Sequence, residues 1–531
     1  MALLSNRRQF FSVTASLGSA TLLTSAAATP VQAAPDAATR PERTAALRQQ
    51  RADLMRAVPA APALNNGDEQ RYPSRIASFS KTLRKSVIGE VQPASYSSMI
   101  LACESGRFAD FEAILRGGQV RLKNPSGAFG NQFIGLDQSQ FSIPPAPRFD
   151  SDTQAGEMVE LYWQSLVRDI PFSDYDSHPL IAGACAELGR KPSTVFRGPG
   201  IGAMAGPYVS QFLLQPIHFG TLICDGRQTT AMPGVDYLTQ WADWFSLQVG
   251  ENKGVSAQLE PNSARYVRNG RDLAHYVHYD WSYSPFYQAL WTLLSYGASA
   301  YTENNPLLWS RGQEPYLHFG PPDAFDFVSR AAKPAFQAAW WQKWMVHRRL
   351  RPEEFGGRVH QNLEQVTTYP IHREVLASQA LRKSREKWGT GLLAQAYPEG
   401  CPPHSAYPSG HATVAGACVT MLKAFFRESF VIPNPVTSSP DGLRLEPYTS
   451  APLTIGGELD KLAYNIAAGR NFAGIHWRSD MEEGVKLGEA VAIEVLRDLA
   501  SGYEIEDFGG FRCTRVDGLE VLVSPGSAPS R

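Results

Sequence analysis

Residues 406–412, Ala-Tyr-Pro-Ser-Gly-His-Ala, set a hydroxyl, an approachable backbone amide and an imidazole side by side. The apolar run 414–422 follows, and its Ala, Leu and Met content predicts a helix that begins at this segment. Helix N-termini present unpaired N–H groups and a partial positive charge, which makes an oxyanion the natural ligand there. A second Pro-Ser-Gly, at 125–127, has no following histidine and predicts no such site.

A second basic segment, residues 340–352, carries Lys343 and Arg351 among aromatic neighbours. These two residues are eight positions apart, so they converge only through side-chain reach or through unwinding of the helix before the following proline. Arg348 and Arg349 lie between them. Because a charge run on a helix is usually a solvated face, we interpret these two arginines as exposed.

A third basic segment, residues 468–480, places Arg470 six residues before His476 across a turn that contains glycine. Asp480 follows His476 by four residues, which would put its carboxylate one helical turn away, where it could orient the imidazole. Each histidine taken alone is more often structural than functional. The three segments together predict one chemistry.

That chemistry is the binding of a tetrahedral or trigonal-bipyramidal oxyanion. Arginine binds anion oxygens in pairs, lysine adds a point charge, and a serine hydroxyl and a glycine amide add neutral donors. Two histidines can then stand at opposite poles, one bonded to the central atom and one moving protons. Phosphate and vanadate both fit such a set of residues, and the residues alone do not choose between them.

The three segments resemble the motifs of the vanadium-dependent haloperoxidases, which share their anion site with the acid-phosphatase-like superfamily. The spacing between Lys343 and Arg351 is one residue longer than in the phosphatases and chloroperoxidases and is typical of the bromoperoxidase branch. His404, seven residues before His411, also matches that branch. The resemblance covers about residues 72–508, and its matching residues are Lys343, Arg351, Pro352, Pro408, Ser409, Gly410, His411, Gly469, Arg470 and His476.

The resemblance implies a role for each matching residue. His476 would coordinate the metal, His411 would act as acid and base, His404 would tune proton delivery or halide handling, and Lys343 would contact the bound peroxide. Asp280 would support a site histidine, whereas we interpret Trp340 as a core residue rather than a halide contact. The residues implied to hold the oxygens of the vanadate cofactor are Lys343, Arg351, Ser409, Gly410 (through its amide) and Arg470.

The implied activity is that of a vanadium-dependent bromoperoxidase with one vanadate per subunit. Such an enzyme oxidises bromide or iodide with hydrogen peroxide, and the resulting hypohalous acid halogenates organic acceptors. One alternative is an acid phosphatase of the same superfamily, in which His476 attacks phosphorus and His411 protonates the leaving group. Others are a non-catalytic oxyanion-binding protein, which would have no use for His411, and a purely structural subunit. The resemblance also implies a homo-oligomer, a dimer or larger.

Periodicity of the apolar residues predicts a mainly α fold with short strands and long loops in one large domain. The resemblance implies that the helices form two packed bundles. Residues 72–147 and 191–258 are rich in turn-forming residues, and we expect irregular structure there. Predicted helices cover 43–58, a stretch that begins near 153, and 284–296, 324–350, 371–388, 409–427, 459–468 and 480–500.

The N-terminus has the pattern of a twin-arginine export signal at residues 1–33. Asn-Arg-Arg-Gln-Phe-Phe at 6–11 precedes a moderately apolar stretch and the small-residue cleavage pattern Val-Gln-Ala at 31–33. We expect residues 34–71 to be a flexible arm and residues 72–531 to be the haloperoxidase domain, with its anion site in about 324–500. Export would place the protein in the periplasm or outside the cell; a disordered tail is the alternative reading of residues 1–33.

Composition excludes some classes of partner. The formal net charge of the 531 residues is −1, which argues against nucleic acid as the main partner because nucleic-acid-binding proteins usually carry a basic face. We expect no membrane span, since no later segment approaches roughly 18 uninterrupted apolar residues. The six cysteines are widely spaced and contain no CxxC, so they predict no zinc site and leave disulfide pairing open.

Overall fold

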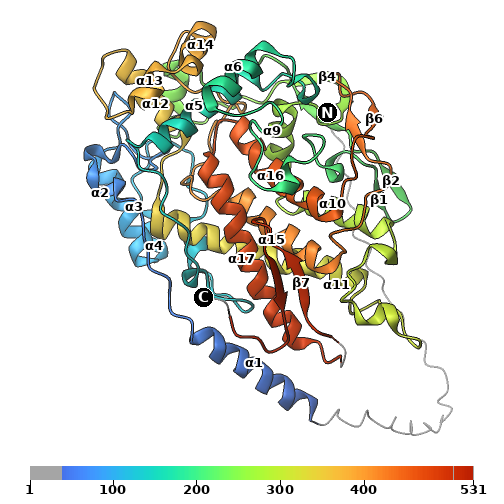
Figure 1. The fold of residues 1–531 in the computed structure, drawn as a ribbon. Helices are drawn as coiled ribbons and strands as arrows, with labels where there is room; N and C mark the ends of the chain where they lie inside the picture. The colour runs from blue at the N-terminus through green and yellow to red at the C-terminus, as the bar shows by residue number, and fades with distance from the viewer. Residues whose placement is uncertain (1–38, 506–507, 530–531) are drawn as a thin grey trace, which may run out of the picture. The chain divides into compact units, whose positions relative to one another are not determined.

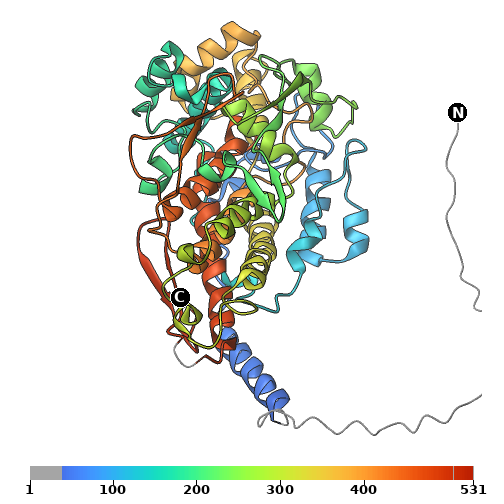
Figure 2. The same ribbon diagram turned by 90° about the vertical axis from the view of Figure 1, so that its right-hand side faces the viewer.

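The computed structural model describes residues 39–505 and 508–529 (Figure 1; Figure 2). The predicted export signal at 1–33 lies outside the described residues. The chain divides into two compact units, residues 1–50 and residues 51–531. Of the first unit the structure describes residues 39–50, which form most of helix α1, Arg40–Arg56. This helix matches the one predicted at 43–58.

Four helices of the second unit form a C-terminal bundle in which α15 packs against each of the other three (Figure 1). Every residue of α15 except His411 is buried, because the sequence from 412 onward is almost entirely apolar or small. The helices of this bundle are α11, Pro321–Trp341; α15, Gly410–Phe425; α16, Ile455–Phe472; and α17, Arg478–Gly502.

Glycines bring the backbones of α15 and α17 into direct contact. A Cβ atom on Gly488 would lie 1.9 Å from the carbonyl oxygen of Thr413, and one on Gly416 would lie 2.0 Å from that of Val485. Gly484, one turn before Gly488, faces the first turn of α15 in the same way. Only residues without a side chain permit this approach, which sets the spacing between the N-terminal ends of the two helices.

A second group of helices packs around α5, which also contacts α16 of the C-terminal bundle. This arrangement agrees with the prediction of a mainly α protein built from packed helical bundles. Among the described residues, no helix combines the length and the apolar character needed to cross a membrane. The helices of the second group are α5, Asp152–Val167; α6, Pro179–Leu188; α13, Arg373–Ala377; and α14, Gln379–Trp388.

The remaining described elements are short. Eight strands form four two-stranded antiparallel sheets, each pairing consecutive strands. The strands are β1, Ile217–Phe219; β2, Leu222–Cys224; β3, Gln228–Ala231; β4, Leu259–Arg265; β5, Val436–Ser438; β6, Leu445–Pro447; β7, Phe511–Thr514; and β8, Glu520–Val523. The helices are α2, Asp68–Arg71; α3, Pro93–Ser105; α4, Phe108–Glu112; α7, Ile201–Met204; α8, Trp241–Gln248; α9, Gly270–Tyr279; α10, Ser284–Ser295; and α12, Pro352–Leu363.

Three sequence predictions about helices are wrong in detail. The helix predicted at 324–350 ends at Trp341, continues as the π-helical turn η8 (Gln342–His347), and stops at Arg348, whose φ is 42°. The helix predicted at 371–388 is broken at Ser378, whose hydroxyl accepts the amide hydrogen of Leu381 and so caps α14. Residues 72–147 are less irregular than expected because they contain α3, which starts at a proline. In the first two cases a local turn or capping residue outweighs the apolar periodicity, and in the third a proline starts a helix where turn-forming residues had suggested irregular structure.

Cysteine pairing, which the sequence leaves open, is absent from the described residues. All six cysteines are free thiols there, five of them buried and Cys224 exposed.

The contact between α15 and α17 yields a prediction about stability. Gly488→Ala should lower the midpoint of urea unfolding, because its methyl group would overlap the Thr413 carbonyl; overpacking of this kind costs about 1–3 kcal/mol. Gly156→Ala is the matched control, since the same methyl group within α5 would meet nothing within 4 Å. The control should match or exceed the wild-type midpoint. An unchanged midpoint for Gly488→Ala would contradict the close packing.

Candidate active site

Ser409 and Gly410 form the start of α15. The Ser409 hydroxyl caps the helix by accepting the amide hydrogen of Ala412 at 3.4 Å. The Ser409 amide donates to the carbonyl of Asp480 at 2.9 Å, which ties the start of α15 to the start of α17. Gly410 occupies the first helical position, where amides have no intrahelical acceptor. A Cβ atom on Gly410 would lie 3.1 Å from the Phe336 ring, so the site requires glycine or a displaced ring.

Lys343 reaches the same region from the π-helical turn η8. Its ammonium group is fully buried and donates to the carbonyls of Ser405 at 2.8 Å and Ala406 at 2.6 Å. The Ser405 hydroxyl donates back to the Lys343 carbonyl at 2.7 Å. Burial, and next the charge of Arg351, hold the pKa of Lys343 well below its ordinary value. The chain therefore confines a lysine beside a second cation.

Arg351 connects all three basic segments. Arg351 precedes Pro352, and the proline keeps the backbone of Arg351 extended. Of the two ways in which Lys343 and Arg351 could converge, the chain thus uses unwinding of the helix before the proline. Its guanidinium donates to the carbonyl of His404 at 2.8 Å and to the carbonyl of Ile475 at 2.8 Å. The same group lies 2.9 Å from Nε2 of His476 and 2.9 Å from Nδ1 of His404. Arg351 thus faces both histidines at once.

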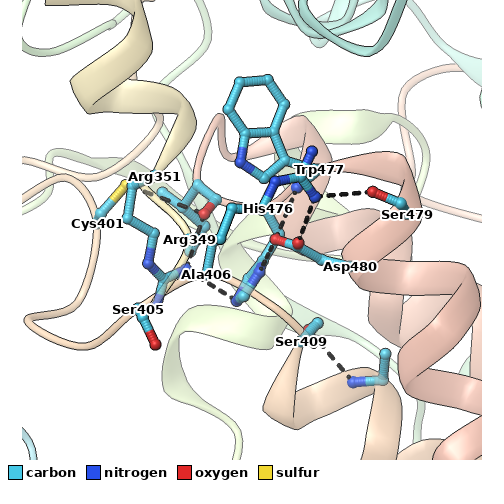
Figure 3. Close-up of polar contacts among 12 residues, drawn as sticks. Arg349, Arg351, Cys401, Ser405, Ala406, Ser409, His476, Trp477, Ser479 and Asp480 are labelled. Carbon is cyan, nitrogen blue, oxygen red and sulfur yellow. Dashed lines mark hydrogen bonds and ion pairs between the residues drawn. The ribbon is translucent and has the colours of Figure 1, made fainter. Parts of the chain in front are cut away.

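His476 has a defined tautomer because of the groups at its two ring nitrogens (Figure 3). Arginine can only donate, so Nε2 of His476 accepts from Arg351, and Nδ1 carries the proton. That proton points to Oδ2 of Asp480, 2.7 Å away, which confirms the contact predicted from their spacing. The carboxylate also accepts the amide hydrogen of Trp477 at 3.0 Å. This arrangement directs the lone pair of Nε2 toward the cations.

The prediction that Arg348 and Arg349 form an exposed face is wrong. Arg349 is 3% exposed and donates to Oδ1 of Asp480 at 2.9 Å. Arg348 is half-buried and pairs with Glu69 at 2.7 Å. The left-handed conformation of Arg348 ends the helix, so the two side chains do not follow a helical face and Arg349 turns inward.

Arg470 enters from α16 and retains unused hydrogen-bonding capacity. One of its terminal nitrogens donates to the carbonyl of Val277 at 2.7 Å, and the guanidinium lies 5.6 Å from the centre of the Tyr397 ring. Its Nε–H is buried and has no partner among the described residues. Buried polar groups are normally paired, so an unpaired donor here indicates a missing acceptor.

His411 lies on the solvent side of the site. Its side chain is 21% exposed, and its Nε2 lies 3.1 Å from Oδ1 of Asp280, the residue that ends α9. Burial and the charge of Arg470 lower the pKa of His411, whereas Asp280 acts in the opposite direction. The structure therefore brings Asp280 to the histidine that can exchange protons with solvent.

His404 is buried against Trp340, with their ring centres 4.9 Å apart. Trp340 also donates from its indole nitrogen to the carbonyl of Asn124 at 3.0 Å, just before the second Pro-Ser-Gly segment. Trp340 is half-buried rather than enclosed in the core: it packs against a small hydrophobic cluster on one side, and its ring lies next to His404.

The assembled site has an excess of buried positive charge. Arg351 contacts Nε2 of His476, and burial, followed by the charges of Arg351, Lys343 and Arg470, holds the pKa of His476 well below its ordinary value. The nearby carboxylates already have partners: Asp480 and Asp280 each contact a histidine, and Glu354 accepts the backbone amide hydrogen of Arg351. Buried charge requires a counter-charge. An oxyanion with four or five oxygens would supply it and would also accept the unpaired Nε–H of Arg470.

Comparison with known proteins agrees with this geometry. The family model described as the VCPO second helical-bundle domain matches residues 324–504, which include every predicted site residue except Asp280. The vanadium-dependent bromoperoxidase of Ascophyllum nodosum is 30% identical over 488 residues, covering 85% of this chain and 86% of that protein. The chain belongs to the vanadium-dependent haloperoxidases.

Two further haloperoxidases match nearly the whole chain. The vanadium-dependent bromoperoxidase of Corallina officinalis is 29% identical over 580 residues, covering 89% of this chain and 96% of that protein. The homohexameric structure of a second vanadate-dependent bromoperoxidase from Ascophyllum nodosum superposes with a TM-score of 0.89 at 27% identity, covering 96% of this chain and 94% of that one. The haloperoxidase fold therefore extends well beyond the C-terminal bundle.

Sequence reasoning missed three side chains that support the haloperoxidase site. Tyr397 lies with its ring under Arg470, and Glu157 and Gln154 of α5 both accept hydrogen bonds from Arg349. Tyr397 lies in a loop with no motif. The signal from α5 was available, because a helix with polar residues on its buried face requires buried partners for them.

The contact between Asp280 and His411 can be tested by titration. Asp280→Asn should lower the pKa of His411, because it removes the negative charge that favours the imidazolium form. The pKa can be followed by NMR on protein labelled at histidine. Glu399→Gln is the matched control, since Glu399 pairs with His278 instead, and it should leave the His411 titration in place. A His411 pKa that stays constant or rises in Asp280→Asn would contradict the contact.

Proposed function

We propose that this chain is a vanadate-dependent bromoperoxidase that binds one vanadate per subunit and oxidises bromide or iodide with hydrogen peroxide. The observation that carries the proposal is the buried cluster of cations at His476, where Arg351 lies 2.9 Å from Nε2 and the charges of Arg351, Lys343 and Arg470 act on the imidazole. Membership of the vanadium-dependent haloperoxidases supports vanadate as the oxyanion.

The donor set fits vanadate. Lys343, Arg351, Arg470, the Ser409 hydroxyl and the Gly410 amide would hold its oxygens, and Nε2 of His476 would bind vanadium. Bound vanadate supplies a Lewis acid that polarises hydrogen peroxide without changing its own oxidation state. The protein's contribution is to hold this anion in a dry site, where fixed positive charges act strongly.

His411 moves the proton. Burial and the charge of Arg470 lower its pKa, which favours the neutral imidazole that can accept a proton from incoming hydrogen peroxide. Its partial exposure lets it exchange that proton with solvent, and Asp280 stabilises the imidazolium that forms. Overall, hydrogen peroxide, halide and one proton give hypohalous acid and water. The hypohalous acid then halogenates organic acceptors.

The first test is bromination of monochlorodimedone by purified protein with hydrogen peroxide, with and without orthovanadate. Activity should require vanadate and should be suppressed by phosphate, which competes for the same cations. His476→Ala should abolish both vanadate binding and bromination, because it removes the Nε2 lone pair that is proposed to bind vanadium. Full bromination by His476→Ala would refute the site assignment.

The alternative activity, phosphate ester hydrolysis, uses the same residues. The contact of Asp480 with Nδ1 would orient His476 equally well as a nucleophile toward phosphorus. Hydrolysis of p-nitrophenyl phosphate that vanadate inhibits, without any bromination, would establish the phosphatase instead.

His404 is the residue to which we assign halide handling. His404→Ala should change the ratio of bromide to iodide oxidation more than it changes vanadate affinity, because the ring contacts Arg351 from the side of Trp340. Steady-state rates with each halide and a vanadate titration measure the two effects separately. A halide ratio equal to that of the wild type would remove this role.

Assembly and location follow from the same proposal. The homohexameric relative supports a homo-oligomer of two or more subunits for this chain, which light scattering of the purified protein would test. The twin-arginine pattern at 1–33 supports export to the periplasm or beyond. Residues 34–71 are proposed as the arm and 72–531 as the haloperoxidase domain. Cell fractionation and N-terminal sequencing of the mature protein would test the signal and its cleavage.

A further inference from the structure

Arg349 is buried between α5 and the start of α17 and makes four side-chain hydrogen bonds. One terminal nitrogen donates to the Ser479 hydroxyl at 2.7 Å and to Oδ1 of Asp480 at 2.9 Å (Figure 3). The other donates to Oε1 of Gln154 at 2.7 Å and to Oε2 of Glu157 at 2.8 Å. The guanidinium carbon also lies 4.9 Å from the centre of the Trp477 ring. The predicted exposed arginine is therefore one of the most constrained side chains near the site.

Charges alternate along this contact chain from α5 to the anion site. Glu157 balances Arg349 and also accepts the amide hydrogen of Ser479 at 2.9 Å. Arg349 in turn pairs with one oxygen of Asp480, and the other oxygen accepts Nδ1–H of His476. Each oxygen of the Asp480 carboxylate thus has a separate partner, which prevents the carboxylate from rotating.

We propose that Arg349 is a positioning residue of the anion site: it holds Asp480 as an oriented carboxylate, and Asp480 in turn holds His476 with Nε2 directed at the oxyanion. This inference rests on the proposed function, since the oxyanion is vanadate there. The hydrogen bonds of the Arg349 side chain go to Ser479, Asp480, Gln154 and Glu157 and not to a residue that would hold the oxyanion. Arg349 therefore acts on the anion site through Asp480.

The geometry gives the reason why Asp480 needs this partner. Asp480 is fully buried; its Oδ1 accepts from Arg349, and its Oδ2 accepts from His476 and from the Trp477 amide. Without Arg349, Oδ1 would lose its charged donor, and a buried carboxylate oxygen without a partner is costly. The carboxylate could then turn, and the imidazole would lose the contact that orients it.

The experiment is a vanadate titration of vanadate-free protein for the wild type, Arg349→Met, Asp480→Asn and the double variant. Arg349→Met should weaken vanadate binding about 10- to 100-fold, the usual effect of losing a group that orients a metal-ligating histidine. Arg348→Met is the matched control, because Arg348 pairs with Glu69 rather than with Asp480. This variant should leave the vanadate affinity unchanged. Equal losses for the two arginines would overturn the proposal.

The double variant separates positioning from a merely structural role. If Arg349 acts through Asp480, the double variant should bind vanadate no more weakly than whichever single variant binds it less tightly; additive losses would overturn the proposal.

Arg349→Lys keeps the charge with fewer donors and provides the result if Arg349→Met does not fold. It should bind vanadate less tightly than the wild type, and this loss should vanish when Asp480→Asn is also present; a loss that persists there would overturn the proposal. Inorganic phosphate serves as a parallel probe for all variants. A wild-type protein that binds phosphate but not vanadate would refute the proposed function, while the ratios of phosphate affinity would still decide the role of Arg349.

Discussion

The site depends above all on the guanidinium of Arg351. This group donates to the carbonyls of His404 and Ile475 and faces a ring nitrogen of both His404 and His476. It thereby holds together three chain segments, since His404 lies 53 residues after Arg351 and Ile475 lies 124 residues after it. A buried cation in contact with two histidines is unfavourable unless an anion joins them. The same interaction that assembles the site therefore also creates its need for an oxyanion.

Much of this arrangement was predictable from the sequence, because its elements have local signals. The helix start at Ser409 follows from a capping serine and the apolar residues behind it, and the structure places α15 there. The spacing of His476 and Asp480 predicted one helical turn, and their side chains meet. The roles of His411, His404 and the cations came from the family resemblance, and the structure brings these residues together without testing what they do.

The residues that sequence reasoning missed depend on long-range geometry. The helix that carries Lys343 ends in a π-helical turn and a left-handed residue, and no periodicity indicates that ending. Its consequence is that Arg349 points inward, toward polar residues of α5 nearly two hundred positions earlier in the chain. Polar residues on the buried face of α5 show that partners are needed, but no local signal says that Arg349 is the partner. Charge on a helix was therefore misread as a solvated face.

The glycine contacts between α15 and α17 have a further consequence for how such a site can vary. Because backbone atoms meet directly at Gly416 and Gly488, no side chain lies between the two helices there whose size could alter their separation. The distance between Ser409 and Asp480, at the ends of these helices, is thus set by main-chain geometry and by the hydrogen bond that joins them. Trp340 and His404 line one side of the anion site. Substitutions there can change which molecules reach the site while the dimensions of the anion site stay constant.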